Sequence, residues 1–238
     1  MTAKFVLSSP AGYNYYQMHW VYYFGRVLIR IMIFPFADWE VKGRENVPEK
    51  GPVLIVSNHL HLADPPIVAT SIRLKTVFMA KEELWHNGWS RYWVEHFGAF
   101  PVRRGGFNRD AIQHAEDWLK KGVSVIMFPE GTRSNNAQLQ QAFPGAALIA
   151  LRLGVPILPV SVTGTDKLNH LVRCLWHRAK IIVTIGQPFN PPSPDGNLAR
   201  EQRNKLTNDM MMKIAGLLPP EYRGVYAGGV NANNREGK

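Results

Sequence analysis

Short apolar runs alternate with segments of helical periodicity over most of this 238-residue chain. Runs of four to eight apolar residues are typical of buried strands, whereas apolar residues three or four positions apart predict amphipathic helices. The runs predict strands at 52–57, 76–80, 99–102, 123–128, 155–162 and 180–185. The periodic segments predict helices directly after Asp64 and at 84–97, 108–121, 144–152 and 198–217. Such alternation predicts an α/β fold with a largely parallel central sheet flanked by helices.

The segment that precedes this region has a different pattern. Seven aromatic residues lie between Tyr13 and Phe24, and a helix over residues 14–34 would have two contrasting sides. One side contains histidine, tyrosines and the two arginines, and the other contains Trp20, Val21, Phe24, Leu28, Ile31 and Met32. A basic, aromatic-rich amphipathic helix can lie in the headgroup layer of a membrane. We expect this placement, and the alternative is a helix packed on the domain's own core with its arginines in water.

These patterns divide the chain into three expected parts. An aromatic-rich amphipathic membrane-association segment covers 1–38, one catalytic-size domain covers 39–218, and a Gly- and Asn-rich tail, expected to be mobile, covers 219–238. The apolar run near the N-terminus is too short for a secretory signal. A spanning helix needs about 20 mostly apolar residues, and residues 15–36 include several polar and charged side chains. We therefore expect peripheral attachment to the cytoplasmic face of the cell membrane.

Charge and cysteine content narrow the classes of partner. Lys and Arg number 28 against 18 Asp and Glu, and the net charge of +10 favours an anionic partner. Nucleic acid, phosphorylated metabolites, acidic carrier proteins and anionic lipids all meet that condition, but no recognisable nucleic-acid-binding motif accompanies the charge. The single cysteine, Cys174, excludes an internal disulfide and a Cys-rich zinc site, and fits a reducing compartment.

Polar motifs follow three of the predicted strands. They are the segments 58–64, 103–106 and 128–134. Because functional sites of parallel sheets collect beyond the carboxyl ends of the strands, we expect the three motifs to meet at one edge.

The first motif contains a histidine five residues before an aspartate. Across a strand-to-helix turn, Asp64 can fold back onto the His59 ring, fix its tautomer and leave the other ring nitrogen to accept a proton from a hydroxyl. Two alternatives stay open at this point. Asp64 could merely cap its helix while His59 bonds a turn carbonyl, or His59, His61 and Asp64 could bind zinc.

The other two motifs are suited to phosphate. Arg133 and the pair Arg103-Arg104 present planar guanidinium forks, and Gly131 permits close approach of the backbone. A solvated basic loop is the alternative, but three arginines at neighbouring strand ends favour a phosphate site.

At this point the sequence resembles a family. The segments 58–64, 98–104, 128–134 and 155–160 are similar to the four ordered motifs of the glycerolipid acyltransferases, and most similar to bacterial 1-acyl-sn-glycerol-3-phosphate acyltransferases. The likeness covers roughly residues 40–190. It implies that His59 is the general base and that Asp64 orients it.

The resemblance also implies a set of substrate-binding residues. Arg104 matches the arginine that binds the substrate phosphate, and the proline-rich fourth motif is expected to shape a substrate pocket. The full expected set is Asn58, Arg103, Arg104, Glu130, Gly131, Thr132, Arg133, Pro156 and Pro159. The chain departs from the family at His61, often a serine, and at Arg103, commonly acidic. We expect His61 to make a supporting hydrogen bond.

The expected activity is transfer of a fatty acyl group from acyl-CoA or acyl carrier protein to 1-acyl-glycerol-3-phosphate, giving phosphatidic acid in phospholipid biosynthesis. No cofactor and no metal is expected, and the absence of a Gly-x-Ser-x-Gly elbow favours direct transfer without an acyl-enzyme. The alternatives are a related acyltransferase acting on glycerol 3-phosphate, a glycolipid or another lysolipid, a non-catalytic lipid- or acyl-CoA-binding protein, and a metal-dependent hydrolase.

Overall fold

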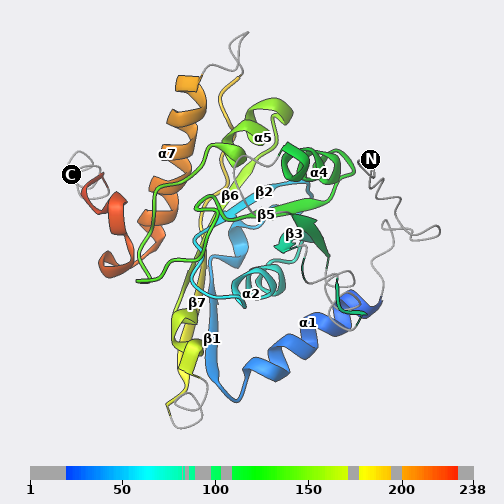
Figure 1. Ribbon diagram of the computed structural model, residues 1–238, viewed down its shortest axis with the longest axis vertical. Helices are drawn as coiled ribbons and strands as arrows, with labels where there is room; N and C mark the ends of the chain where they lie inside the picture. Colours follow the sequence, from blue (N-terminus) through cyan, green and yellow to red (C-terminus); the bar gives the residue numbers. More distant parts are fainter. Residues whose placement is uncertain are drawn as a thin grey trace.

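The computed structural model of the protein describes residues 20–81, 83, 86–88, 98–102, 109–170, 177–193 and 200–229. Within these residues, a seven-stranded sheet has the order β1-β7-β6-β2-β5-β3-β4 (Figure 1). Every neighbouring pair runs parallel except β6 and β7. The strands are β1 (Ala37–Lys42), β2 (Leu54–Ser57), β3 (Thr76–Lys81), β4 (Ala99–Val102), β5 (Ser124–Met127), β6 (Ile157–Thr163) and β7 (Ala179–Ile185).

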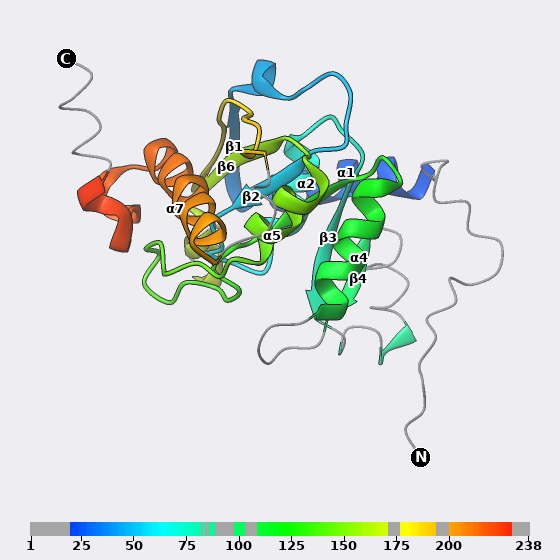
Figure 2. The same ribbon diagram turned by 90° about the horizontal axis from the view of Figure 1, so that it is seen from above.

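Helices cover both faces of the sheet (Figure 2). On one face lie α4 (Arg109–Lys120), α5 (Gly145–Leu153) and α7 (Arg200–Leu217), whose apolar residues form a core with β2 and β5. On the other face, α2 (Asp64–Ser71) builds a second core, and α1 (Trp20–Ile33) packs beside α2. The predicted α/β fold with a mostly parallel, helix-flanked sheet is therefore confirmed.

Burial on both faces explains why the central strands were visible in the sequence. All four residues of β2 and all four of β5 are buried, so each strand is a continuous apolar run with one serine rather than an alternating pattern. The helix α5 ends as its sequence predicts, because Gly154 adopts a φ of 62° and its N–H bonds the Ala150 carbonyl.

The edge strand β1 was not predicted. It begins at Ala37, inside the segment that the sequence analysis assigned to the membrane, so the folded domain starts earlier than residue 39. The pattern Asp38-Trp39-Glu40-Val41 alternates polar and apolar residues, as a strand with one covered face does. The alternation covers only the six residues of the strand, Ala37–Lys42, and it comes three residues after an apolar helix.

The start of the C-terminal tail is folded, which corrects the boundary drawn at residue 219. Short 3₁₀ helices cover Pro220–Tyr222 and Gly224–Tyr226. The Tyr222 carbonyl accepts the Leu139 N–H at 2.9 Å, and the Leu139 carbonyl accepts the Val225 N–H at 3.3 Å. Its Gly-rich composition suggested mobility, but backbone bonds from Tyr222 and Val225 to Leu139 hold this part of the tail in place. Residues 230–238 lie outside the described residues, as do Cys174, residues 1–19 and all of the expected helix over 84–97 except residues 86–88.

The helix α1 is tied to α2 by a side chain. Arg26 Nη2 donates to the carbonyls of Thr70 at 3.0 Å and Ile72 at 2.7 Å, where α2 ends. None of the helices in the described part of the chain has the length and apolar character needed to cross a membrane.

Candidate active site

His59 and Asp64 meet at the carboxyl end of β2. The His59 Nδ1 atom lies 2.9 Å from Asp64 Oδ2, and the Asp64 side chain is fully buried. A buried carboxylate in this position accepts the Nδ1 proton and fixes the tautomer, so that Nε2 is the nitrogen able to take a proton. The His59 side chain keeps 14% of its surface exposed, so the ring is within reach of a ligand.

The loop between the two residues is wrapped around the same carboxylate. Besides the ring of His59, Asp64 Oδ2 accepts the N–H groups of Leu60 at 2.6 Å and His61 at 2.7 Å. Asp64 is itself the first residue of α2, and the preceding Ala63 provides no side-chain cap. The helix-capping alternative for Asp64 is therefore wrong, because its carboxylate bonds to the loop that positions His59. A buried charge requires such partners.

The motif after β5 supports the histidine from the neighbouring strand. The ring of Phe128 stacks on the His59 ring with centroids 4.3 Å apart and planes inclined by 26°. The His59 carbonyl accepts the Ser134 N–H at 2.8 Å, and the His59 N–H donates to Glu130 Oε1 at 3.1 Å. The predicted meeting of the motifs after these two strands is thus confirmed.

Glu130 is a buried link between loops. Its second oxygen, Oε2, accepts the Gln140 N–H at 2.9 Å, and only 3% of the residue is exposed. Burial raises the pKa of Glu130 from 4.5 to about 7, although the bonds from the Gln140 and His59 N–H groups oppose the rise. Glu130 therefore links the histidine loop to the backbone at Gln140 and holds His59 in position.

The three residues that follow Glu130 are exposed, namely Gly131, Thr132 and Arg133. Gly131 has a φ of 69°, and an added Cβ would lie 3.1 Å from the Phe143 ring, so the turn is suited to glycine. Burial lowers the pKa of His61, whereas the nearby Asp64 carboxylate raises it. The positive charge of Arg133 also lowers this pKa, so Arg133 acts electrostatically on the histidine loop. His61 Nδ1 accepts the Ala63 N–H at 3.2 Å, so His61 makes the supporting bond expected of it.

Three other expected substrate residues lie away from the exposed histidine face. Asn58 is buried, and its amide both accepts the Val162 N–H and donates to the Val162 carbonyl, each at 2.8 Å. The Pro156 carbonyl accepts the Leu54 N–H at the amino edge of the sheet, opposite His59. Pro159 is buried within β6, paired with Val56. Arg103 and Arg104 lie outside the described residues.

Two exposed apolar side chains near His59 were not singled out from the sequence. Leu62, in the histidine loop, is 65% exposed, and Phe143, beside Gly131, is 64% exposed. The Phe143 N–H donates to the Pro129 carbonyl at 2.8 Å, which fixes its place next to the motif. No local pattern marks Phe143, because only this tertiary bond brings it to the site. Exposed apolar groups beside a proton acceptor suit a ligand with an apolar part.

The described residues contain no group of three or more His, Cys, Asp or Glu side chains arranged to hold a metal ion. The hydrolase alternative required His59, His61 and Asp64 as such a group, yet His61 Nδ1 is engaged by Ala63 and His59 Nδ1 by Asp64. The geometry instead suits abstraction of a proton from a bound hydroxyl.

Comparison with known proteins shows which family the chain resembles. Residues 38–163 match the acyltransferase family. The chain is 28% identical over 205 residues to the chloroplastic 1-acyl-sn-glycerol-3-phosphate acyltransferase BAT2 of Brassica napus, covering 83% of this chain and 58% of that protein. It is 35% identical over 139 residues to the 1-acyl-sn-glycerol-3-phosphate acyltransferase of Streptococcus pneumoniae, covering 58% of this chain and 50% of that protein. The chain thus spans about half the length of these relatives.

A solved structure has the same fold. The crystal structure of the 1-acyl-sn-glycerophosphate acyltransferase PlsC from Thermotoga maritima superposes with a TM-score of 0.64 at 28% sequence identity. The match covers 84% of this chain and 78% of that one.

Proposed function

The chain belongs to the acyltransferase family, and we propose on that basis that it acylates the free hydroxyl of 1-acyl-glycerol-3-phosphate from an acyl thioester, giving phosphatidic acid. The observation that carries the proposal is the His59–Asp64 pair at the carboxyl end of β2, with His59 Nδ1 2.9 Å from Asp64 Oδ2 and the His59 side chain partly exposed. The names of the relatives support the choice of acceptor.

In the proposed mechanism, the acceptor hydroxyl bonds to His59 Nε2 and its oxygen attacks the thioester carbonyl. Its proton passes to Nε2, and Asp64 stabilises the imidazolium. The tetrahedral intermediate then collapses, the carbon–sulfur bond breaks, and the leaving thiolate takes the proton back from Nε2. The acyl group ends on the acceptor oxygen, free thiol is released, and no cofactor is needed. General-base catalysis supplies about 10²–10⁴-fold, so positioning must supply the remainder.

The acceptor phosphate would be bound by arginines. Arg133 is exposed in the turn that follows β5, next to the histidine loop on which its charge acts. We propose that Arg133 binds the phosphate together with Arg103 and Arg104, whose role rests on the family resemblance. A guanidinium can bond two phosphate oxygens at once.

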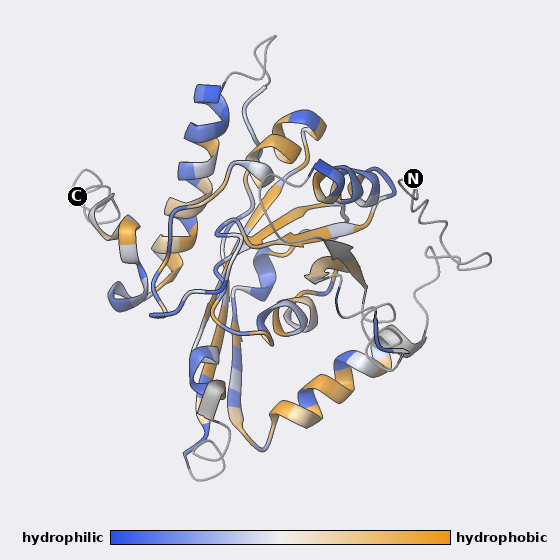
Figure 3. Cartoon of the chain, viewed as in Figure 1, coloured by the Kyte–Doolittle hydropathy of each residue, from blue (hydrophilic) through white to orange (hydrophobic). Residues whose placement is uncertain are grey.

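We also propose that α1 lies on the membrane surface. Its exposed large apolar side chains form a row that continues just beyond its end, namely Tyr23, Phe24, Val27, Ile31, Met32 and Phe34. The helix is largely coloured hydrophobic in Figure 3. Arg26, on the basic side of this helix, bonds the end of α2 and so turns toward the domain. With Arg26 turned inward, exposed apolar side chains of α1 such as Ile31 face solvent, where they can enter a bilayer.

Co-sedimentation with anionic vesicles tests the membrane contact. Phe24→Gln combined with Ile31→Gln is expected to lower the bound fraction severalfold. Val225→Gln removes an equally exposed apolar side chain from the C-terminal 3₁₀ helix and is expected to change nothing. Equal binding of both variants would refute the contact through α1.

A thiol-release assay tests the activity. Acyl-CoA and acyl carrier protein are each combined with 1-acyl-glycerol-3-phosphate, glycerol 3-phosphate and a monoacylglycerol without phosphate, and the products are identified by mass. We expect thiol release that depends on 1-acyl-glycerol-3-phosphate and yields phosphatidic acid, and its loss in a folded His59→Ala variant. Preference for another acceptor would indicate the related acyltransferase, and ligand binding without thiol release would indicate a non-catalytic protein.

A further inference from the structure

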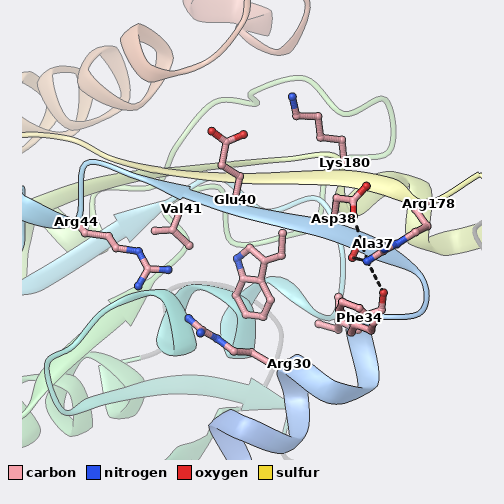
Figure 4. A pocket seen from close by; sticks show the side chains of 11 residues that line it. Arg30, Phe34, Ala37, Asp38, Glu40, Val41, Arg44, Arg178 and Lys180 are labelled. Atoms are coloured by element: carbon pink, nitrogen blue, oxygen red, sulfur yellow. Dashed lines mark hydrogen bonds and ion pairs between the residues drawn. The ribbon is translucent and has the colours of Figure 1, made fainter.

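Away from His59, a cavity opens where α1 joins β1. It has a volume of about 410 Å³ and lies between the end of α1, the edge strand β1 and the start of β7 (Figure 4). This volume falls in the range of small-molecule sites. His59 is not among its lining residues. Three strand spacings separate β1 from β2, a lateral distance of about 14 Å.

Two arginines approach this cavity without a carboxylate partner among the described residues. Arg30 and Arg44 point to the same side of β1 as Val41, whereas Glu40 points to the opposite side (Figure 4). The carboxylate of Glu40 pairs with Lys42 at 3.6 Å. Burial lowers the pKa of Arg30, and the positive charges of Arg44 and Arg26 lower it further. An anion between the two guanidinium groups would relieve this repulsion.

The other acidic residue that lines the cavity, Asp38, forms an ion pair with Arg178, whose Nη2 lies 3.1 Å from Asp38 Oδ1. Trp39 alternates with Asp38 along β1 and so faces the side of the two arginines. The Arg30 guanidinium lies 5.5 Å from the centre of the Trp39 ring. The Trp39 Nε1 atom is buried and has no hydrogen-bond partner. A buried donor left unpaired costs about 1–3 kcal/mol, so an acceptor at this place is favoured.

The mouth of the cavity continues into the apolar side of α1. Phe34 lines the cavity and is 68% exposed, and the equally exposed Ile31 lies one turn earlier on the helix. Arg178 fixes the Phe34 end of the helix, with its guanidinium 4.7 Å from the ring and a bond of 2.7 Å to the Phe34 carbonyl. An anion site adjoining an exposed apolar row matches a lipid better than a free ion.

We propose that this cavity binds the phosphate headgroup of an anionic membrane phospholipid that is not the substrate. Arg30, Arg44 and the Trp39 indole N–H hold the phosphate oxygens, and the acyl chains lie along Ile31 and Phe34. A lipid held there would fix the position of α1 and β1 relative to the bilayer while the active site turns over other molecules. The proposal requires no acyl transfer, so it stands or falls independently of the proposed activity.

Indole NMR on the full chain tests it. The protein is labelled with ¹⁵N at tryptophan, and the Trp39 signal is assigned by its loss in Trp39→Phe. The probes are dihexanoyl phosphatidylglycerol below its critical micelle concentration, dihexanoyl phosphatidylcholine and inorganic phosphate. We expect a saturable downfield shift of the Trp39 signal with phosphatidylglycerol only. Arg30→Gln and Arg44→Gln should each weaken binding at least about tenfold.

Matched variants control for charge and folding. Lys205→Gln removes an exposed positive charge from α7, on the opposite face of the sheet, and should leave binding unchanged. Arg30→Lys keeps the charge and should retain more affinity than Arg30→Gln, while the other indole signals report an intact fold. The absence of a saturable shift, an equal response to inorganic phosphate, or equal loss in Lys205→Gln would each overturn the proposal.

Discussion

Replacement of Asp64 by asparagine separates the charge of this residue from its shape. An amide oxygen in the place of Oδ2 still accepts the N–H groups of Leu60, His61 and the His59 ring, so the loop geometry is expected to persist. What is lost is the negative charge that stabilises the imidazolium when His59 takes the acceptor proton.

The size of that loss follows from the contact. His59 Nδ1 and Asp64 Oδ2 are 2.9 Å apart, which places the centres of the imidazolium and carboxylate charges about 4 Å apart. With an effective dielectric constant of about 20, the attraction between these charges is about 4 kcal/mol. At 1.36 kcal/mol per factor of ten, Asp64→Asn should lower kcat about 10³-fold. Because the charge acts in the transition state, KM should change little.

Thiol release measured against acceptor concentration gives kcat and KM separately. Asp117→Asn is the matched control, because it makes the same change at a carboxylate that bonds Gln113 on α4. Melting temperatures confirm that both variants fold. If Asp64→Asn kept kcat within about threefold of the unmodified protein, or changed only KM, the general-base role of the pair would be refuted.

Three further changes test other parts of the site. Arg133→Ala should raise KM for 1-acyl-glycerol-3-phosphate about tenfold or more and leave a phosphate-free acceptor unaffected; equal effects on both acceptors would exclude phosphate binding. Because burial raises the pKa of Glu130 from 4.5 to about 7, the folded protein holds a proton that the unfolded chain releases. Urea titrations should show the free energy of unfolding falling by up to about 3 kcal/mol as pH rises through that window, and Glu130→Gln should abolish this component. Asn58→Ala leaves the buried N–H and carbonyl of Val162 unpaired and should cost about 2–4 kcal/mol of unfolding free energy, whereas a loss below about 0.5 kcal/mol would contradict its bracing role.

The sequence alone determined those features whose physical cause is local. The strands β2 and β5 are buried on both faces, so their apolar runs predicted strands without any knowledge of the strands beside them. Asp64 lies five residues after His59 across a single turn, and their contact required no distant segment. The ends of the same two parallel strands, neighbours in the sheet, brought Glu130 to the histidine loop as predicted.

Other features depend on which distant segments meet in the folded chain, and the sequence pattern did not predict them. Asn58 belongs to a segment that resembles a binding motif. Its amide nevertheless bonds the backbone of Val162, which lies more than a hundred residues away in the sequence. The C-terminal residues near Tyr222 are held by Leu139, and Arg26 turns inward because α2 ends beside it. Hydrophobic periodicity predicts that a helix has an apolar and a polar side. Long-range hydrogen bonds and packing determine which of the two sides faces the protein.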